Sequence, residues 1–187
     1  MAQEPIPDLG KWVEKAQAGD SQAFAQVYDA LVKPIYRYIY YRVEESIAED
    51  LTEETFLRIW QNLDKYKKES TPFASWAFRI AHNLVVDHYR KNQSTDEISE
   101  EIPDTQDHSS PEKQANLKLT QVRLRKIIRK LPDNYQQIII LKYINDFDNR
   151  QIAESVGKTE GAVRILQFRA LEQLRGLLTT EQEDLKT

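Results

Sequence analysis

The sequence predicts an all-α protein of two small helical domains joined by an acidic flexible linker, with a helix-turn-helix in the second domain. Glycine is scarce, at 5 of 187 residues, while strong helix formers such as Leu, Ala, Gln, Glu and Lys are abundant. Apolar residues recur at helical spacing on both sides of a proline-containing acidic strip. We therefore place a first domain at residues 1–94, the linker at 95–116 and a second domain at 117–187.

The composition excludes several classes of protein. The 187 residues, 40% of them hydrophobic, are enough to bury a core. The absence of cysteine rules out a disulfide framework and any zinc or redox site built on cysteine. No apolar run has membrane-spanning length, and no signal peptide opens the chain. We expect a cytoplasmic protein with no metal and no cofactor.

Charge is distributed unevenly along the chain. The formal net charge is −4, yet residues 95–116 hold 1 basic against 7 acidic side chains, and residues 117–179 hold 12 against 6. A basic C-terminal unit therefore follows an acidic strip. This arrangement favours nucleic acid as a partner of the second domain.

The acidic strip also has the composition of a linker. Residues 93–112 contain two prolines, many Ser, Asp and Glu, and only two isolated isoleucines. Such a segment buries too little apolar surface to offset the entropy of ordering it, so we expect it to be extended in the free protein. The second domain is expected to begin near Pro111, with Ser110 as the helix cap.

Helical periodicity predicts three or four helices in the first domain. Asp20 or Ser21 can cap a helix whose apolar stripe comprises Phe24, Val27, Tyr28 and Leu31. Pro34 is then expected to restart a tyrosine-rich segment that runs from residue 35 to 43.

A further helix is predicted over residues 46–63, and its apolar stripe comprises Phe56, Ile59, Trp60 and Leu63. Asp50, Glu53 and Glu54 lie within its first two turns. The helix dipole favours negative charge there, so these carboxylates are either ordinary surface residues or part of a binding surface.

The next helix is predicted between residues 72 and 90, and its buried stripe comprises Phe73, Trp76, Ala77, Ile80, Ala81 and Leu84. The opposite face carries Arg79, Asn83, Val86 and Arg90. Cations, an amide and an apolar side chain in one row suit the binding of unstacked bases and phosphates. Alternatively, the two arginines pair with nearby acids and the aromatic residues belong only to the core.

Residues 150–169 have the pattern of a helix-turn-helix. Ala153 lies where the two helices meet, Gly157 supplies a turn residue that accepts positive φ, and Val163 and Leu166 return to the core. The other face of the second helix then presents Arg164, Gln167 and Phe168 to DNA.

Three motifs in this order resemble bacterial RNA polymerase sigma factors of the extracytoplasmic function (ECF) group. They are Ala48-Glu-Asp-Leu-Thr-Glu-Glu-Thr-Phe-Leu-Arg-Ile-Trp60, Pro72-Phe-Ala-Ser-Trp-Ala-Phe-Arg-Ile-Ala-His-Asn-Leu-Val-Val-Asp-His-Tyr-Arg90, and Leu131-Pro-Asp followed by the helix-turn-helix. The resemblance covers residues 20–92 and 117–176. It implies sigma regions 2 and 4, a transcription initiation factor with no catalytic residues, and control by an anti-sigma factor that masks polymerase-binding surfaces.

The resemblance also assigns roles to residues of the first domain. Asp50, Glu53 and Glu54 match the surface that docks on the β′ clamp helices of core polymerase, although Glu53 stands where the family usually has Gln. The minus-10 element is assigned to Tyr66, Lys67, Lys68, Phe73, Arg79, Asn83 and Arg90. Within this set, the loop 66–73 matches the segment that captures a flipped base, and Asn83 matches a base-contacting position.

In the second domain, the resemblance assigns the minus-35 duplex to Lys158, Thr159, Arg164, Gln167, Phe168 and Arg169. Ile165-Leu166 stands where many members have a polar and basic pair, which implies a different base preference. The core polymerase partner includes the β subunit, and the acidic linker is expected to thread the polymerase cleft as a mimic of nucleic acid.

Two other classes remain open at this stage. A repressor or activator with an N-terminal effector domain accounts for the helix-turn-helix but not for the pattern at residues 48–90. An enzyme would use Asp87, His82 and His88 as acid, base or metal ligands. The two histidines are six residues apart and do not match the i, i+4 spacing of a helical metal site.

Overall fold

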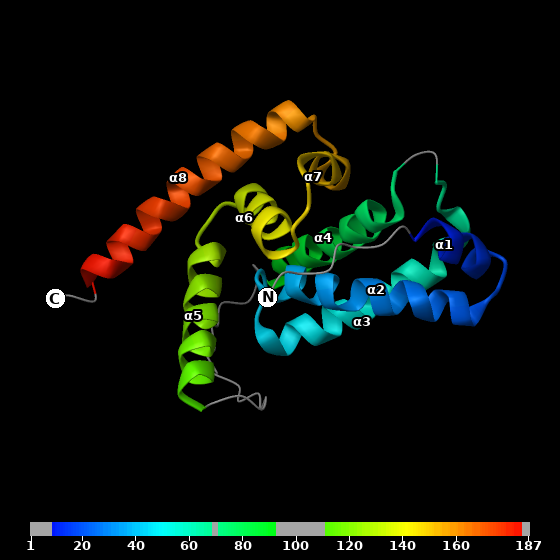
Figure 1. Cartoon of the computed structure of the whole chain (residues 1–187), viewed down its shortest axis with the longest axis horizontal. Coiled ribbons are helices and arrows are strands. Elements are labelled where there is room, and N and C mark those ends of the chain that lie inside the picture. The colour runs from blue at the N-terminus through cyan, green and yellow to red at the C-terminus, as the bar shows by residue number, and fades with distance from the viewer. Residues whose placement is uncertain (1–8, 69–70, 93–110, 185–187) are drawn as a thin grey trace.

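The computed structural model describes residues 9–68, 71–92 and 111–184, and all regular secondary structure among them is helical (Figure 1). The first domain comprises α1 (Gly10–Gln17), α2 (Ser21–Tyr40), α3 (Glu45–Gln61), the short 3₁₀ helix η1 (Leu63–Lys65) and α4 (Phe73–Asn92). The second comprises α5 (Pro111–Arg129), α6 (Asp133–Ile139), the π-helical turn η2 (Ile140–Ile144), α7 (Asn149–Val156) and α8 (Glu160–Asp184). The predicted all-α class with two domains is confirmed.

Helix α2 is one continuous element, so the predicted restart at Pro34 is wrong. Asp20 caps the helix, as predicted, and its Oδ1 accepts from the backbone N–H groups of Gln22 and Ala23. A proline removes one helical hydrogen bond. Leu31 and Ile35 flank it on the buried face with no exposed surface, and this burial offsets the loss.

In α4, four of the six stripe residues are buried while Trp76 and Ile80 are half-buried, and the apolar stripe of α3 is confirmed with one exception. Phe56, Ile59 and Leu63 are buried, but Trp60 is 47% exposed. The reason is that Trp60 lies at the edge of the stripe, where the ring of Phe24 on α2 covers one side at a centroid distance of 4.7 Å. Tyr28, which was predicted on the α2 stripe, is also 41% exposed and packs on Phe56.

The helix-turn-helix of α7 and α8 forms as predicted. Gly157 has φ +65° at the end of α7, and Ala153 and Val163 are buried where the helices meet. Gln151 completes a capping box, because its side chain accepts from the backbone N–H of Asp148 while Asp148 accepts from the backbone N–H of Gln151. The apolar run at residues 138–141 is buried beneath these helices.

Helix α5 begins at Pro111, the position predicted for a helix start, and therefore extends into the segment assigned to the linker. Ser110 and the rest of the linker lie outside the described residues. Within the described part of the chain, none of the helices has both the length and the apolar character needed to cross a membrane.

The two domains pack directly on each other, with α7 beside α4 and η2 beside α2 (Figure 1). Phe78 on α4 and Phe147, between η2 and α7, meet edge to face at a centroid distance of 4.9 Å, and both are buried. Asn145, also buried, donates to the carbonyl of Pro34 at 3.2 Å. These contacts join residues far apart in the sequence into one core.

Candidate polymerase and nucleic-acid interfaces

The outer face of α3 carries acidic and apolar side chains together. Asp50 and Glu53 are exposed, and Glu54 is half-buried with an ion pair to Arg58 at 2.8 Å. Leu57 is 50% exposed one turn further along the same face, next to the exposed ring of Trp60. We call this set, from Asp50 to Trp60, the α3 surface. A charged rim beside exposed large apolar side chains is typical of a protein-binding surface.

Sequence reasoning found the acids of the α3 surface but missed its apolar part. Leu57 was not singled out, and Trp60 and Tyr28 were assigned to the core. The available signal for Leu57 was its position seven residues after Asp50 and four after Glu53, which places all three on one side of a helix. The exposure of the two aromatic rings depends on tertiary packing and has no such signal.

Asn83 lies at a hollow between α3 and α4. The hollow has a volume of about 320 Å³ and is lined by Arg58, Asn62, Lys65, Trp76, Ile80 and Asn83. It combines an amide that can bond to a base edge, two cations and an indole ring. An unpaired nucleotide needs these three kinds of group for its edge, its phosphate and its face. Asn83 and the neighbouring Val86 are exposed, as predicted.

The two aromatic residues assigned to base capture are not on the surface. Tyr66 and Phe73 are 8% and 5% exposed and form an aromatic cluster with Trp76, with ring centroids 5.0 to 5.3 Å apart. Tyr66 also donates to the carbonyl of Thr71 at 2.8 Å. The rings therefore hold the two ends of the loop together. Lys67 and Lys68 are exposed, and Lys68 pairs with Glu14 at 3.0 Å.

Arg79 and Arg90 differ in their surroundings. Arg79 donates to the backbone carbonyls of Glu154 and Ser155, at the C-terminal end of α7, with a distance of 3.3 Å to Ser155. Cations are favoured at that end of a helix because of its dipole. Arg90 is exposed and pairs with Asp87 at 3.0 Å. The second domain thus occupies part of the α4 face that was predicted to bind DNA.

The start of α8 presents the residues predicted for duplex DNA. Lys158, Thr159, Arg164, Phe168 and Arg169 are all exposed. The hydroxyl of Thr159 accepts from the backbone N–H of Ala162 at 3.2 Å and caps the helix. Gln167 is half-buried.

The Gln167 amide is directed back to α7, where it donates to the side-chain oxygen of Asn149 at 2.9 Å. Gln167 therefore braces the two helices in this arrangement. Arg164 makes an exposed ion pair with Glu160 at 3.3 Å, an interaction too weak to prevent a contact with phosphate or base.

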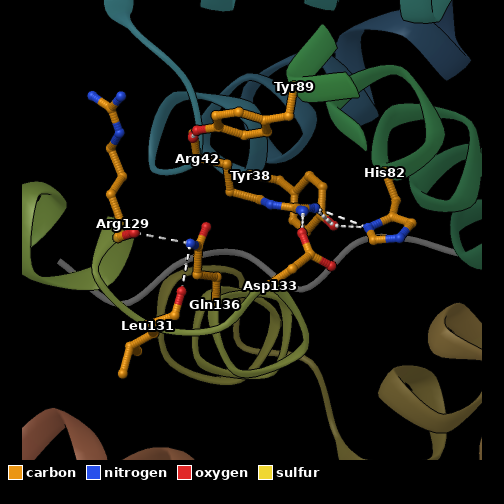
Figure 2. Close-up of polar contacts among 8 residues, drawn as sticks. All are labelled: Tyr38, Arg42, His82, Tyr89, Arg129, Leu131, Asp133 and Gln136. Carbon is orange, nitrogen blue, oxygen red and sulfur yellow. Dashed lines mark hydrogen bonds and ion pairs between the residues drawn. The ribbon is translucent and has the colours of Figure 1, made fainter. Parts of the chain in front are cut away.

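Sequence reasoning missed a buried polar cluster that joins the two domains (Figure 2). Arg42 has no exposed surface, and its guanidinium donates to the hydroxyl of Tyr38, to Nδ1 of His82 at 2.9 Å, and to the carboxylate of Asp133 on α6. Tyr89 donates to the backbone carbonyl of Arg42. The one sequence signal is an arginine between Tyr41 and Val43, in a segment rich in tyrosine and isoleucine that also contains Arg37.

The protonation of this cluster follows from its burial. Burial and the positive charge of Arg42 lower the pKa of His82. A guanidinium can only donate, so Nδ1 of His82 must accept, and this requires a neutral imidazole. Burial raises the pKa of Tyr38 to about 12, so its hydroxyl keeps its proton. The cluster therefore holds one cation, one anion and two neutral groups.

The same domain junction has a second group of ion pairs. Arg125 lies over the ring of Tyr40 at 4.1 Å and within 3.6 Å of Glu45, and Arg129 binds Glu44 at 3.1 Å. Figure 2 also shows Gln136, whose amide donates to the carbonyls of Leu131 at 2.8 Å and Arg129 at 3.2 Å. These bonds hold the turn between α5 and α6 that carries Asp133.

The two histidines considered for the enzyme alternative both make contacts within the first domain. His82 is engaged by Arg42, and the ring of His88 packs edge to face on Tyr89 with a centroid distance of 5.8 Å. No group of three or more potential metal ligands occurs among the described residues.

Comparison with known families identifies both domains. Residues 27–95 match the family described as Sigma-70 region 2, and residues 121–174 match Sigma-70, region 4. The chain therefore has the two domains, region 2 and region 4, of a two-domain sigma factor.

Similar proteins narrow the class. The chain is 32% identical to the ECF RNA polymerase sigma factor SigW of Bacillus subtilis over 180 residues, which cover 89% of this chain and 95% of SigW. It is 36% identical to the ECF RNA polymerase sigma factor BldN of Streptomyces coelicolor over 169 residues, 89% of this chain, but spans only 64% of BldN. The chain belongs to the ECF group of the sigma-70 family.

Solved structures share the fold. The structure of CnrH in complex with the cytosolic domain of CnrY matches 92% of this chain and 97% of that chain, with a TM-score of 0.72 and 24% identity. The sigma factor RpoE of Bartonella quintana, solved with the anti-sigma factor NepR, matches 83% of this chain and 96% of that chain, with a TM-score of 0.63 and 21% identity.

Proposed function

We propose that this protein is a transcription initiation factor that binds core RNA polymerase, directs it to specific promoters and promotes strand opening. The observation that carries the proposal is the presence, in one chain, of an α3 surface that combines acids with exposed apolar side chains, a hollow of about 320 Å³ at Asn83 and an exposed second helix of the helix-turn-helix. These three surfaces match the order of regions 2 and 4 in the sigma-70 family. The bond-forming chemistry belongs to the polymerase, and this chain is not an enzyme.

The α3 surface is the proposed docking site for the β′ clamp helices, with further contacts to the β subunit. Asp50, Glu53 and Glu54 supply charges that steer and orient the partner. Leu57 and Trp60, each about half exposed, supply the apolar area that a stable interface requires at its centre. The acids lie next to this apolar centre, on its N-terminal side along the same helix, which gives the partner one continuous docking surface.

The α4 face is the proposed minus-10 site. An unpaired base can enter the hollow, where Asn83 bonds to its edge and Trp76 offers an aromatic face. Binding the unpaired base offsets the few kcal/mol that unstacking it costs. Arg79, Arg90 and Lys67 contact the phosphates of the same strand. In this proposal Tyr66 and Phe73 do not contact the base; their packed rings hold the two ends of the loop between η1 and α4 together.

The start of α8 is the proposed minus-35 site, in the major groove of duplex DNA. Arg164 and Arg169 are the cations closest to the outward face of the helix, and Lys158 and Thr159 stand at its N-terminal end, where backbone N–H groups bind phosphate. Specificity comes from base-edge contacts by the outward side chains.

The contact of Arg79 with α7 suggests how the free protein is restrained. While Arg79 donates to the carbonyls of Glu154 and Ser155, it is unavailable to a DNA strand. We infer that the domains separate when both promoter elements are bound at once. An anti-sigma factor that seals this closed arrangement would keep the protein from polymerase. RpoE of Bartonella quintana, which shares the fold, was solved in complex with the anti-sigma factor NepR.

Because core polymerase and promoter DNA lie in the bacterial cytoplasm, we propose that the protein acts there. The test is run-off transcription with bacterial core polymerase, the full chain and a pool of promoter fragments from the source genome, with core alone as the control. The expected result is initiation at discrete start sites that depends on the protein. Specific duplex binding without core binding or initiation would instead support a repressor or activator.

A further inference from the structure

Two large apolar side chains face solvent on the recognition helix. Ile165 is 56% exposed and Phe168 is 64% exposed, the two largest exposures among the large hydrophobic residues of the described chain. On the opposite side of the same helix, Val163 and Ala170 have no exposed surface, because that side packs into the core of the domain. The outward apolar pair is therefore not part of the fold's own core.

Cations flank this apolar pair on both sides. With 3.6 residues per turn, Arg164 and Arg169 lie about 140° apart around α8, and Ile165 and Phe168 fall between them. All four side chains are exposed. A helix in the major groove directs its flanks to the phosphates of the two strands and its centre to the base edges. The charges therefore suit the backbone, and the apolar pair meets the bases.

We propose that Ile165 recognises a thymine in the minus-35 element by packing on its C5 methyl group, with Phe168 closing the contact on the neighbouring side. This inference rests on the proposed minus-35 role of α8. Thymine is the one base with a methyl group in the major groove, and an isoleucine side chain has no hydrogen-bonding atom for any other base edge. Ile165 stands at a position that is polar in many family members, and here it contacts the thymine methyl group.

The contribution of the C5 methyl group to binding can be measured directly, because deoxyuridine is thymidine without that methyl group. Removing one methyl from a buried apolar contact costs about 0.8 kcal/mol, or about fourfold in affinity. Holoenzyme formed from the full chain is first used to select bound duplexes from a library randomised over the minus-35 element. Each thymine of the selected element is then replaced singly by deoxyuridine, and the affinity is measured by competition.

The expected result is one thymine whose replacement weakens binding about fourfold in the parent protein. In Ile165→Ser the same replacement has no effect, and in Ile165→Val, which keeps a branched apolar side chain, the effect is retained. All three proteins should have the same Tm, since the residue is more than half exposed.

A deoxyuridine effect of equal size in Ile165→Ser and in the parent would overturn the inference. Unchanged affinity of the parent protein after replacement of each thymine by deoxyuridine would overturn it as well. Either result leaves the proposed function intact as long as the holoenzyme selects a defined duplex. Selection of no preferred duplex, together with a failure to initiate, would refute the proposed function itself.

Discussion

The carboxylate of Asp133 is the sole acidic group that binds the buried Arg42 guanidinium among the described residues, so Asp133→Ala should loosen the junction between the domains. Removing one partner of a fully buried pair typically costs 3–5 kcal/mol. The side chain of Asp133 is 54% exposed, so solvent screens part of the interaction. We expect the free energy of domain closure to fall by about 2–3 kcal/mol, or about 30- to 150-fold in the ratio of closed to open molecules.

The chain contains no cysteine, so two introduced cysteines can be labelled without background. Exposed positions in each domain, Gln26 and Glu172, suit a fluorescence energy-transfer pair. The parent should give a high-transfer population, and Asp133→Ala should move molecules to low transfer. Far-ultraviolet circular dichroism checks that the helices remain intact.

Two matched controls separate the ion pair from general effects. Asn134→Ala alters the neighbouring exposed position on α6, and Asp29→Ala removes an exposed carboxylate on α2. Both should behave as the parent. If Asp133→Ala gives the same transfer distribution as these controls, the Arg42 cluster does not hold the domains together and the reasoning is refuted.

Other predictions concern stability and binding. The pKa of His82 is lowered in the folded state, so as pH falls the unfolded chain binds a proton before the folded chain does. The contribution of His82 to the free energy of unfolding is therefore fully present above pH 6.5 and declines below it. In urea titrations between pH 5 and 7, His82→Gln should reduce this dependence of stability on pH. Gly157→Ala should lower the free energy of unfolding by about 1–2 kcal/mol, because the residue has φ +65°; the backbone conformation alone causes this cost, since no atom lies close enough to clash with the new methyl group. Gly176→Ala, inside α8, should raise the free energy of unfolding by about 0.5–1 kcal/mol. Leu57→Ala should weaken core polymerase binding at least about tenfold in a competition assay without lowering Tm, and an unchanged affinity would remove Leu57 from the docking surface. Arg164→Ala should weaken duplex binding by a similar factor on all sequences, as a phosphate contact requires, and a loss of about 1–3 kcal/mol confined to the minus-35 element would mark a base contact instead.

Local rules predicted most of the secondary structure. The cap at Asp20, the helix start at Pro111 and the left-handed turn at Gly157 each depend on a residue's own backbone preference, so they can be inferred from the chain alone. The buried stripe of α4 and the exposure of Asn83 follow from helical spacing in the same way.

The features that local patterns did not reveal depend on distant residues. Pro34 lies inside a helix because burial on both sides of it outweighs the lost hydrogen bond. Tyr66 turns inward because it completes an aromatic cluster with Phe73 and Trp76, and Gln167 turns back because Asn149 is within reach. None of these partners is visible in a local pattern.

The sequence by itself determined the helical class, the two domains, the acidic face of α3 and the outward face of the recognition helix, because periodicity and residue chemistry act over a few neighbouring positions. The tertiary structure alone decided that Arg42 is buried, that it binds a carboxylate 91 residues away, and that Arg79 donates to the C-terminal end of α7. A charged residue is buried only where the complete fold supplies compensating partners, and those partners come from both domains.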